Sequence, residues 1–157
     1  MLRKNLPNIF FIVVIFVLDR ISKYYILELS KSYEKLNIQV TSFLNFNLVW
    51  NDGIAFGLFS FQQNFYYQIL TIIIITITLI IIWFAFRSKG FEKIGFLMIS
   101  GGSLGNIFDR LYYSSVIDFI DLSYNNFHWF IFNVADIFIT FGVIMLISIE
   151  LTKTKKT

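Results

Sequence analysis

The chain has 157 residues, of which 57% are hydrophobic and only 15% charged, and its mean hydropathy is +0.70. This composition argues against a soluble globular protein and favours one integral-membrane domain spanning residues 1–157. Cysteine is absent, which excludes disulfides, a thiol nucleophile and a cysteine-based metal site. The formal net charge of +3 is small and gives no reason to expect a nucleic-acid partner.

Four stretches of the chain are expected to form transmembrane helices. The clearest runs from Ile69 to Phe86, which is 18 residues without a charge and about the length that crosses hydrocarbon as a helix. Its Ile and Thr content would also suit a buried strand, but a strand of that length is far beyond the usual range. We therefore expect a membrane α-helical fold with spans at about 7–27, 66–86, 94–108 and 133–151.

The N-terminal segment has two interpretations. Arg3 and Lys4 precede the apolar run Ile9–Leu18, an order that is also typical of a cleaved signal peptide. No small-x-small cleavage site follows, however, because the next residues are Asp19-Arg20-Ile21-Ser22-Lys23. An uncleaved first span that carries Asp19 inside the membrane fits the sequence better.

The longest polar stretch follows the first span. Partial alternation of apolar and polar residues at 38–41 and 43–50 predicts short strands, and Asn51-Asp52-Gly53 predicts a turn. The apolar stretch 54–59 that comes next is too short to cross a membrane. We expect it to lie on the membrane surface or to cover a site.

Lysine and arginine are distributed unevenly between the two sides of the predicted membrane. Eight of the thirteen lie in the N-terminus, in the link 87–93 and in the C-terminal tail, whereas eight of the ten acids lie on the other side. The positive-inside rule then places both termini in the cytoplasm. The outer loops are expected at 28–65 and 109–132, so all candidate chemistry faces the extracytoplasmic side.

Two carboxylates in the second outer region have the strongest chemical interest. If Asp118 and Asp136 meet in a poorly solvated site, one holds a proton while the other stays ionised and takes a proton from water. Hydrolysis of a peptide by water needs that division between base and acid. Two structural alternatives stay open: Asp118 as a solvated loop acid, and Asp136 as the N3 residue of a helix capped by Asn133. Asp121 is interpreted as an ordinary loop acid.

Other polar and small residues cluster near the ends of the predicted spans. Gly101 and Gly105 form a small-xxx-small pattern that favours close helix packing. Asp19 and Lys23 are four residues apart, which predicts an ion pair on the first span. A further set shares one face at the outer end of the third span: Asn106, Asp109 and Arg110. Three interpretations of this set stay open, namely an ion pair between Asp109 and Arg110, binding of a ligand by Arg110, and a structural network.

A serine mechanism and a metal site are both disfavoured. Gly101-Gly102-Ser103-Leu104-Gly105 matches the G-x-S-x-G nucleophile elbow, which needs a strand-turn-helix setting and a histidine partner. Here the motif falls in a predicted transmembrane helix, and the only histidine, His128, is expected to lie at the membrane interface among aromatic residues. One histidine and scattered acids do not offer a metal site, so we expect none.

Five motifs in the chain resemble those of lipoprotein signal peptidase (signal peptidase II), in the same order along a four-span chain of the right length. Together they cover nearly the whole sequence. They are Asp19-x-x-Ser22-Lys23, Asn51-x-Gly53-x-Ala55-Phe56-Gly57, Gly101-Gly102-x-x-Gly105-Asn106-x-x-Asp109-Arg110, Val116-Ile117-Asp118-Phe119 and Phe132-Asn133-x-Ala135-Asp136. No motif residue departs from the family pattern, whereas the stretch 119–131 follows no pattern that predicts its structure.

The resemblance implies an aspartic endopeptidase of the bacterial inner membrane that cuts a prolipoprotein just before its diacylglyceryl-modified cysteine. It implies four transmembrane helices with a small extracytoplasmic β-cradle and a short surface helix. Membrane lipids and the diacylated prolipoprotein are the implied partners, and we expect a monomer without a cofactor. The implied roles are a catalytic dyad of Asp118 and Asp136, substrate contacts from Asn51, Gly53, Asn106, Arg110 and Asn133, and structural support from Asp19, Lys23 and Asp109.

Three rival interpretations are less consistent with the sequence. A proton-coupled transporter would place its acids along a path, often in repeated halves, whereas here the acids gather on one side and no repeat is found. A rhomboid-like serine protease is disfavoured by the lone His128 and by four spans. A purely structural membrane protein would not explain why acids are kept at the outer ends of the helices.

Overall fold

The computed structural model describes residues 2–52, 63–124 and 127–154. Gly53 and the predicted surface segment 54–59 lie outside these described residues. The helices are α1 (Leu2–Ser30), α2 (Gln63–Arg87), α3 (Gly90–Tyr113) and α4 (Val134–Thr154). The strands are β1 (Asn37–Gln39), β2 (Leu44–Asn51), β3 (Val116–Tyr124) and β4 (Phe127–Phe132).

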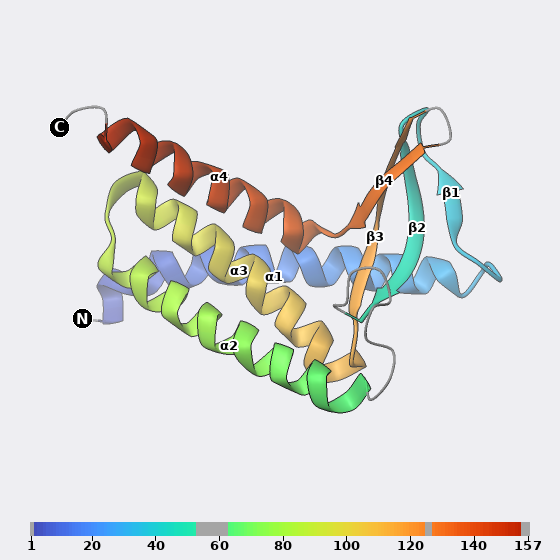
Figure 1. The fold of residues 1–157 in the computed structure, drawn as a ribbon, viewed down its shortest axis with the longest axis horizontal. Coiled ribbons are helices and arrows are strands. Elements are labelled where there is room, and N and C mark those ends of the chain that lie inside the picture. Colours follow the sequence, from blue (N-terminus) through green and yellow to red (C-terminus); the bar gives the residue numbers. More distant parts are fainter. Residues whose placement is uncertain (1, 53–62, 125–126, 155–157) are drawn as a thin grey trace.

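The four helices run along one another, and the sheet stands across one end of them (Figure 1). Helix α3 packs against all three other helices. Both chain ends and the α2–α3 connection lie at the end of the molecule opposite the sheet (Figure 1). The elements that follow α1 and α3, and the start of α4, therefore meet at the same end.

Two helical segments are long and apolar enough to cross a membrane, Phe65–Arg87 and Val134–Lys153. Many of their large side chains are exposed in the isolated chain, as in Ile72 and Ile147. A helix that is apolar on its outward surface suits lipid better than water. Helices α1 and α3 are just as long, but they carry the buried charged residues described below.

All four predicted spans overlap helices of the structure, and the largest correction concerns the third. Helix α3 extends five residues beyond the predicted end at residue 108, through Tyr113. The second outer region, 109–132, contains the end of α3 and most of a hairpin in which β3 and β4 pair antiparallel. Left-handed Ser114, with φ of 58°, ends α3 immediately before β3.

Glycines let α1 and α4 approach the backbone of α3. The predicted small-xxx-small pair, Gly101 and Gly105, faces α1, and a Cβ at Gly101 would lie 2.7 Å from Cβ of Ile15. A Cβ at Gly105 would lie 2.5 Å from Oδ2 of Asp19 on α1. A Cβ at Gly102 would lie 2.5 Å from the carbonyl oxygen of Ala135 on α4. All these distances are too short for a real side chain, so these glycines keep Asp19 and the first turn of α4 against α3.

The sheet is antiparallel with strand order β1-β2-β3-β4, and its first two strands lie where the alternating pattern predicts them. Buried Ile117 and Phe119 of β3 pack with Ile26 and Leu36, which fixes the sheet against the end of α1. Successive side chains of a strand point to opposite faces. Asp118 lies between these two core residues and therefore points away from that core.

Candidate functional site

Asp118 lies on β3 and is only 3% exposed. Its carboxyl group accepts two side-chain hydrogen bonds: Oδ2 from the amide of Asn51 on β2 at 2.8 Å, and Oδ1 from the amide of Asn133 at 2.6 Å. Two amide donors satisfy one oxygen each, so the carboxyl group is held in a fixed orientation. It is not the solvated loop acid of the structural alternative.

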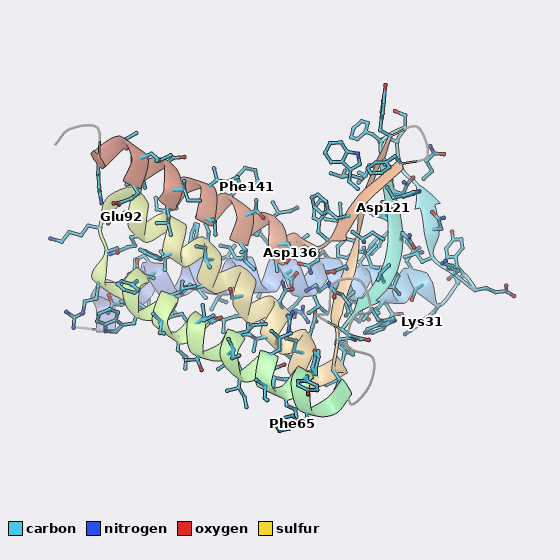
Figure 2. All side chains as sticks on the ribbon, in the orientation of Figure 1. Lys31, Phe65, Glu92, Asp121, Asp136 and Phe141 are labelled. Carbon is cyan, nitrogen blue, oxygen red and sulfur yellow. The ribbon has the colours of Figure 1, made fainter. Side chains whose placement is uncertain are left out.

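Asp136 lies in the first turn of α4 (Figure 2), and Asn133 caps this helix. The Asp136 backbone N–H donates to Oδ1 of Asn133 at 3.0 Å, and the Asn133 backbone N–H donates to Oδ2 of Asp136 at 3.1 Å. This reciprocal pair is a capping box, so the predicted capping role is confirmed. The other oxygen of Asp136 accepts from the side-chain amide of Asn106 on α3 at 2.8 Å.

Asn133 is the residue that joins the two carboxyl groups. Its side-chain amide donates to Asp118, while its side-chain carbonyl accepts from the backbone of Asp136. Asn133 is fully buried, and the Asp136 carboxylate acts electrostatically on Asp118. Two acids that are 18 positions apart in the sequence therefore belong to one buried polar cluster.

Two further acids, Asp19 and Asp109, each accept a hydrogen bond from the backbone next to one member of this pair. Oδ1 of Asp19 on α1 accepts from the backbone N–H of Ala135, next to Asp136, at 3.1 Å. Oδ2 of Asp109 on α3 accepts from the backbone N–H of Ile117, next to Asp118, at 3.2 Å. Both supporting acids are fully buried. They connect the helices to the two segments that carry the central carboxyl groups.

Two cations neutralise these supporting acids. Lys23, only 1% exposed, has its ammonium nitrogen 3.0 Å from Oδ2 of Asp19 and 2.6 Å from Oδ2 of Asp109. Arg20 binds the same two acids, with both nitrogen–oxygen distances 2.6 Å. A buried charge is tolerated only when it is paired and hydrogen-bonded, and this four-membered network meets that condition.

Lys23 also connects the ionic network to the central pair. Its ammonium donates to Oδ1 of Asn106 at 2.9 Å, which leaves the amide of Asn106 to donate to Asp136. The side-chain amide of Asn106 is thereby fixed in one orientation, because its oxygen faces the lysine. The positive charge of Lys23 reaches Asp136 through one neutral residue.

The environment of Asp118 shifts its protonation. The pKa of Asp118 is raised from its ordinary 3.8 to about 6, chiefly by burial and also by the negative charge of Asp136, while the hydrogen bonds from Asn51 and Asn133 and the charge of Lys23 oppose the rise. Desolvation and a like charge both disfavour the ionised form. Asp118 is therefore able to hold a proton close to neutral pH.

The residues predicted for substrate contact differ in whether they contact the two central carboxyl groups. Asn51, Asn106 and Asn133 donate directly to the two central carboxyl groups. Arg110 instead donates to the backbone carbonyl of Asn106 at 3.3 Å, and its Nε is buried without a hydrogen-bond partner among the described residues. Asp109 forms its ion pairs with Lys23 and Arg20, so the ion pair that spacing suggested between Asp109 and Arg110 is not the arrangement found.

Sequence reasoning missed Arg20 and misjudged Asp121. Arg20 lies beside Asp19 in an otherwise apolar segment, and a charged residue at that depth is itself the signal that could have identified it. Asp121 is fully buried on β3 rather than a loop acid, and its Oδ2 lies 2.8 Å from Nδ1 of His128 on β4. The cross-strand pairing that creates this contact has no signal in the sequence.

Ser103 lies in the middle of α3, so the strand-turn-helix setting of a nucleophile elbow is absent at this position. His128 lies on β4, next to Asp121. Among the residues that the structure describes, no three histidine or acidic side chains gather in a way that could hold a metal ion. The central pair of carboxyl groups is therefore the chemically distinctive feature of the described part of the chain.

The fold resembles that of solved bacterial membrane enzymes. One such structure, determined by the in meso method at 2.3 Å resolution, superposes with a TM-score of 0.76 at 29% identity, covering 96% of this chain and 91% of that chain. A second, at 1.9 Å resolution, superposes with a TM-score of 0.75 at the same identity, covering 92% of each chain. The chain thus shares the fold of a class of bacterial membrane enzymes.

The family follows from sequence comparison. The model of the family described as Signal peptidase (SPase) II matches residues 11–152. The lipoprotein signal peptidase of Pelagibacter ubique (strain HTCC1062) is 47% identical over 96% of this chain and 91% of its own length. That of Anaplasma phagocytophilum (strain HZ) is 38% identical over 97% and 96%. The chain belongs to the signal peptidase II family, and this membership supports the function of a lipoprotein signal peptidase, a membrane-bound hydrolase.

Proposed function

We propose that the chain is an aspartic endopeptidase that removes signal peptides from diacylglyceryl-modified prolipoproteins by cutting just before the lipidated cysteine. The observation that carries this proposal is the buried pair Asp118 and Asp136, held together through Asn133. Two carboxyl groups in one poorly solvated site titrate as a unit and hold one proton between them readily. Such a pair supplies both the base and the acid that peptide hydrolysis by water needs.

The two acids take different roles in this proposal. Asp136 lies at the N-terminus of α4, where the helix dipole favours a negative charge, and it accepts hydrogen bonds from Asn106 and Asn133. It is the ionised base that takes a proton from the attacking water. Asp118, whose pKa is raised to about 6, gives its proton to the carbonyl oxygen as the water attacks. When the tetrahedral intermediate collapses, the proton that Asp136 took from the water passes to the leaving amine as the C–N bond breaks, and the hydroxyl proton returns to Asp118.

Side chains around the pair bind the peptide. Asn51, Asn106 and Asn133 keep the two carboxyl groups oriented and face the peptide backbone beside them. Arg110 has a buried Nε without a partner among the described residues, and this N–H suits a carbonyl oxygen of the substrate. Gly53 is proposed to let the backbone approach the substrate. Asp19, Lys23 and Asp109 act indirectly. The two acids bind the backbone next to Asp136 and Asp118, and Lys23 pairs with both acids.

The proposed location is the bacterial inner membrane, with four spans and both termini in the cytoplasm. Two helices are apolar enough to cross a membrane, and the sheet lies opposite both termini (Figure 1). With the positive-inside rule, this arrangement supports an extracytoplasmic sheet and site. The lipid tails of the substrate would remain in the bilayer while the scissile bond lies at its outer surface. The protein is proposed to act as a monomer without a cofactor.

The proposal is tested by a pair of substrates that differ in one modification. A prolipoprotein whose cysteine carries diacylglycerol is expected to be cut before that cysteine, whereas the unmodified precursor stays intact, as mass spectrometry of the products would show. Ser103→Ala should cut at the wild-type rate, and EDTA should leave the rate unchanged. Equal cleavage of both precursors would contradict the lipid requirement, and loss of activity in folded Ser103→Ala would revive a serine mechanism.

A further inference from the structure

The β3–β4 hairpin exposes an unusual concentration of aromatic side chains. Tyr124, Phe127, Trp129 and Phe130, here called the aromatic hairpin, are each 62–68% exposed. Their rings form contacts along the strand, with Phe127 and Trp129 centroids 6.5 Å apart. Trp129 and its neighbours together would form a large apolar surface in water, and such surfaces mark binding partners or membranes.

The aromatic hairpin carries almost no charge to keep it soluble. In the described parts of β3 and β4 the only carboxyl groups are those of Asp118 and Asp121, and both are buried. Apart from the Tyr124 phenol, the one titratable side chain that is exposed in these described strands is His128, and Nδ1 of its ring lies 2.8 Å from Oδ2 of Asp121. Since β4 is an edge strand, exposed lysine or glutamate would be the usual protection against aggregation in water. The absence of lysine and glutamate from β3 and β4 indicates that this surface faces lipid rather than water.

The hairpin is continuous with the surface that lipid would cover. Only Asn133 separates Phe132, the last residue of β4, from Val134, the first residue of α4. From the start of α4 the hairpin extends outward past the helix, across the end of the bundle (Figure 1). Phe141, 58% exposed, lies on the side of α4 toward which the hairpin extends (Figure 2). Bilayer beside α4 would therefore pass beneath the hairpin.

We propose that the aromatic hairpin is an interfacial anchor that inserts into the headgroup and glycerol-ester region of the outer phospholipid leaflet. Tryptophan and tyrosine prefer this region because an apolar ring carries a polar edge. Phe127 and Phe130 would reach the first acyl carbons, while the imidazole of His128 stays among the headgroups. Since β3 carries Asp118 at its other end, the anchor would hold that strand along the membrane surface. This inference depends on the membrane location but not on the peptidase mechanism.

Three tryptophans in different surroundings make a direct test possible. Trp50→Phe combined with Trp83→Phe leaves Trp129 as the only fluorophore, and matched variants leave only Trp83 of α2 or only Trp50 of β2. Each is placed in phosphatidylglycerol–phosphatidylcholine vesicles whose acyl chains are brominated either near the glycerol or near the methyl end. Trp129 should emit at shorter wavelength than free tryptophan, be quenched most by the shallow bromines and resist aqueous iodide.

The result that overturns the anchor is iodide quenching of Trp129 as strong as that of free tryptophan, with no effect of brominated lipid. Protection of Trp129 that grows with protein density and is insensitive to bromine would instead assign the hairpin to a second copy of the chain, and would also overturn the anchor. If the double variants fail to fold, Trp129→Phe alone is compared with wild type. The difference between their emission spectra is then the emission of Trp129, and its quenching by brominated lipid or by iodide shows whether Trp129 lies in the membrane or in water.

Discussion

Asp118→Asn and Asp136→Asn should each abolish cleavage of a diacylated prolipoprotein, with the rate falling by about 10²–10⁴-fold. An amide in place of Asp136 cannot accept the proton of the attacking water. An amide in place of Asp118 cannot deliver a proton to the carbonyl oxygen. Because the two act as one unit, the double variant should be no slower than either single variant. The measurement is single-turnover cleavage in detergent micelles, with a folding check by thermal unfolding.

Asp121→Asn is the matched control for these variants. Asp121 is a buried acid on the same strand as Asp118, three residues further along, but its carboxyl group faces His128. Asn retains an oxygen that can accept from the imidazole, so Asp121→Asn should cleave at close to the wild-type rate. Wild-type activity in folded Asp118→Asn would contradict the acid–base pair. Equal loss in all three variants would indicate damage to the sheet rather than to the chemistry.

Lys23→Met should destabilise the protein by about 3–5 kcal/mol, because it removes one partner from a buried ionic network. The lysine is 1% exposed and binds Asp19, Asp109 and Asn106. Without it, Arg20 is the only cation among the described residues that pairs with the two buried carboxylates, and Asn106 is no longer fixed toward Asp136. Activity should fall together with stability. Chemical unfolding in micelles at one lipid concentration measures the change.

Lys31→Met is the control for Lys23→Met, since Lys31 is a paired lysine that directly follows the end of α1. Lys31 also pairs with an acid, Glu28, at 2.6 Å, but the two side chains are 68% and 44% exposed. Solvent-exposed pairs contribute little to stability, so this substitution should leave stability and cleavage nearly unchanged. Equal effects of the two substitutions would show that burial of the network does not matter. A neutral Lys23→Met would remove the network from the explanation of the site.

The features of the structure that depend on local sequence patterns were predicted better than those that depend on long-range contacts. The spacing of Asn133 and Asp136 predicted the capping box, because both groups lie within one helical turn. The 18-residue uncharged run predicted α2, and alternation predicted β1 and β2. In each case the physical cause is short-range, so it leaves a periodic or capping signal in the sequence.

The rest depends on pairing between distant segments. Asp121 is buried because β3 pairs with both β2 and β4, and nothing in its immediate neighbours indicates this. The connection from Asp109 to the backbone of Ile117 depends on how α3 ends at left-handed Ser114. The i,i+4 spacing of Asp19 and Lys23 predicts their ion pair but gives no signal for Arg20, whose contact with Asp109 depends on the packing of α1 against α3. The resemblance to a family implied the dyad of Asp118 and Asp136 that we propose, and the structure shows the hydrogen bonds that hold these two residues in place.

The central claim is that Asp118 and Asp136 form one proton-sharing unit. It is tested most directly by ¹³C NMR titration of carboxyl-labelled aspartates in the micelle-embedded chain, with Asp118 assigned by its Asn variant. Asp118 should titrate near pH 6, since burial raises its pKa and the charge of Asp136 raises it further. In Asp136→Asn the midpoint of Asp118 should move to lower pH while staying above 3.8, because burial remains. A midpoint that is the same with and without the Asp136 carboxylate would contradict the account.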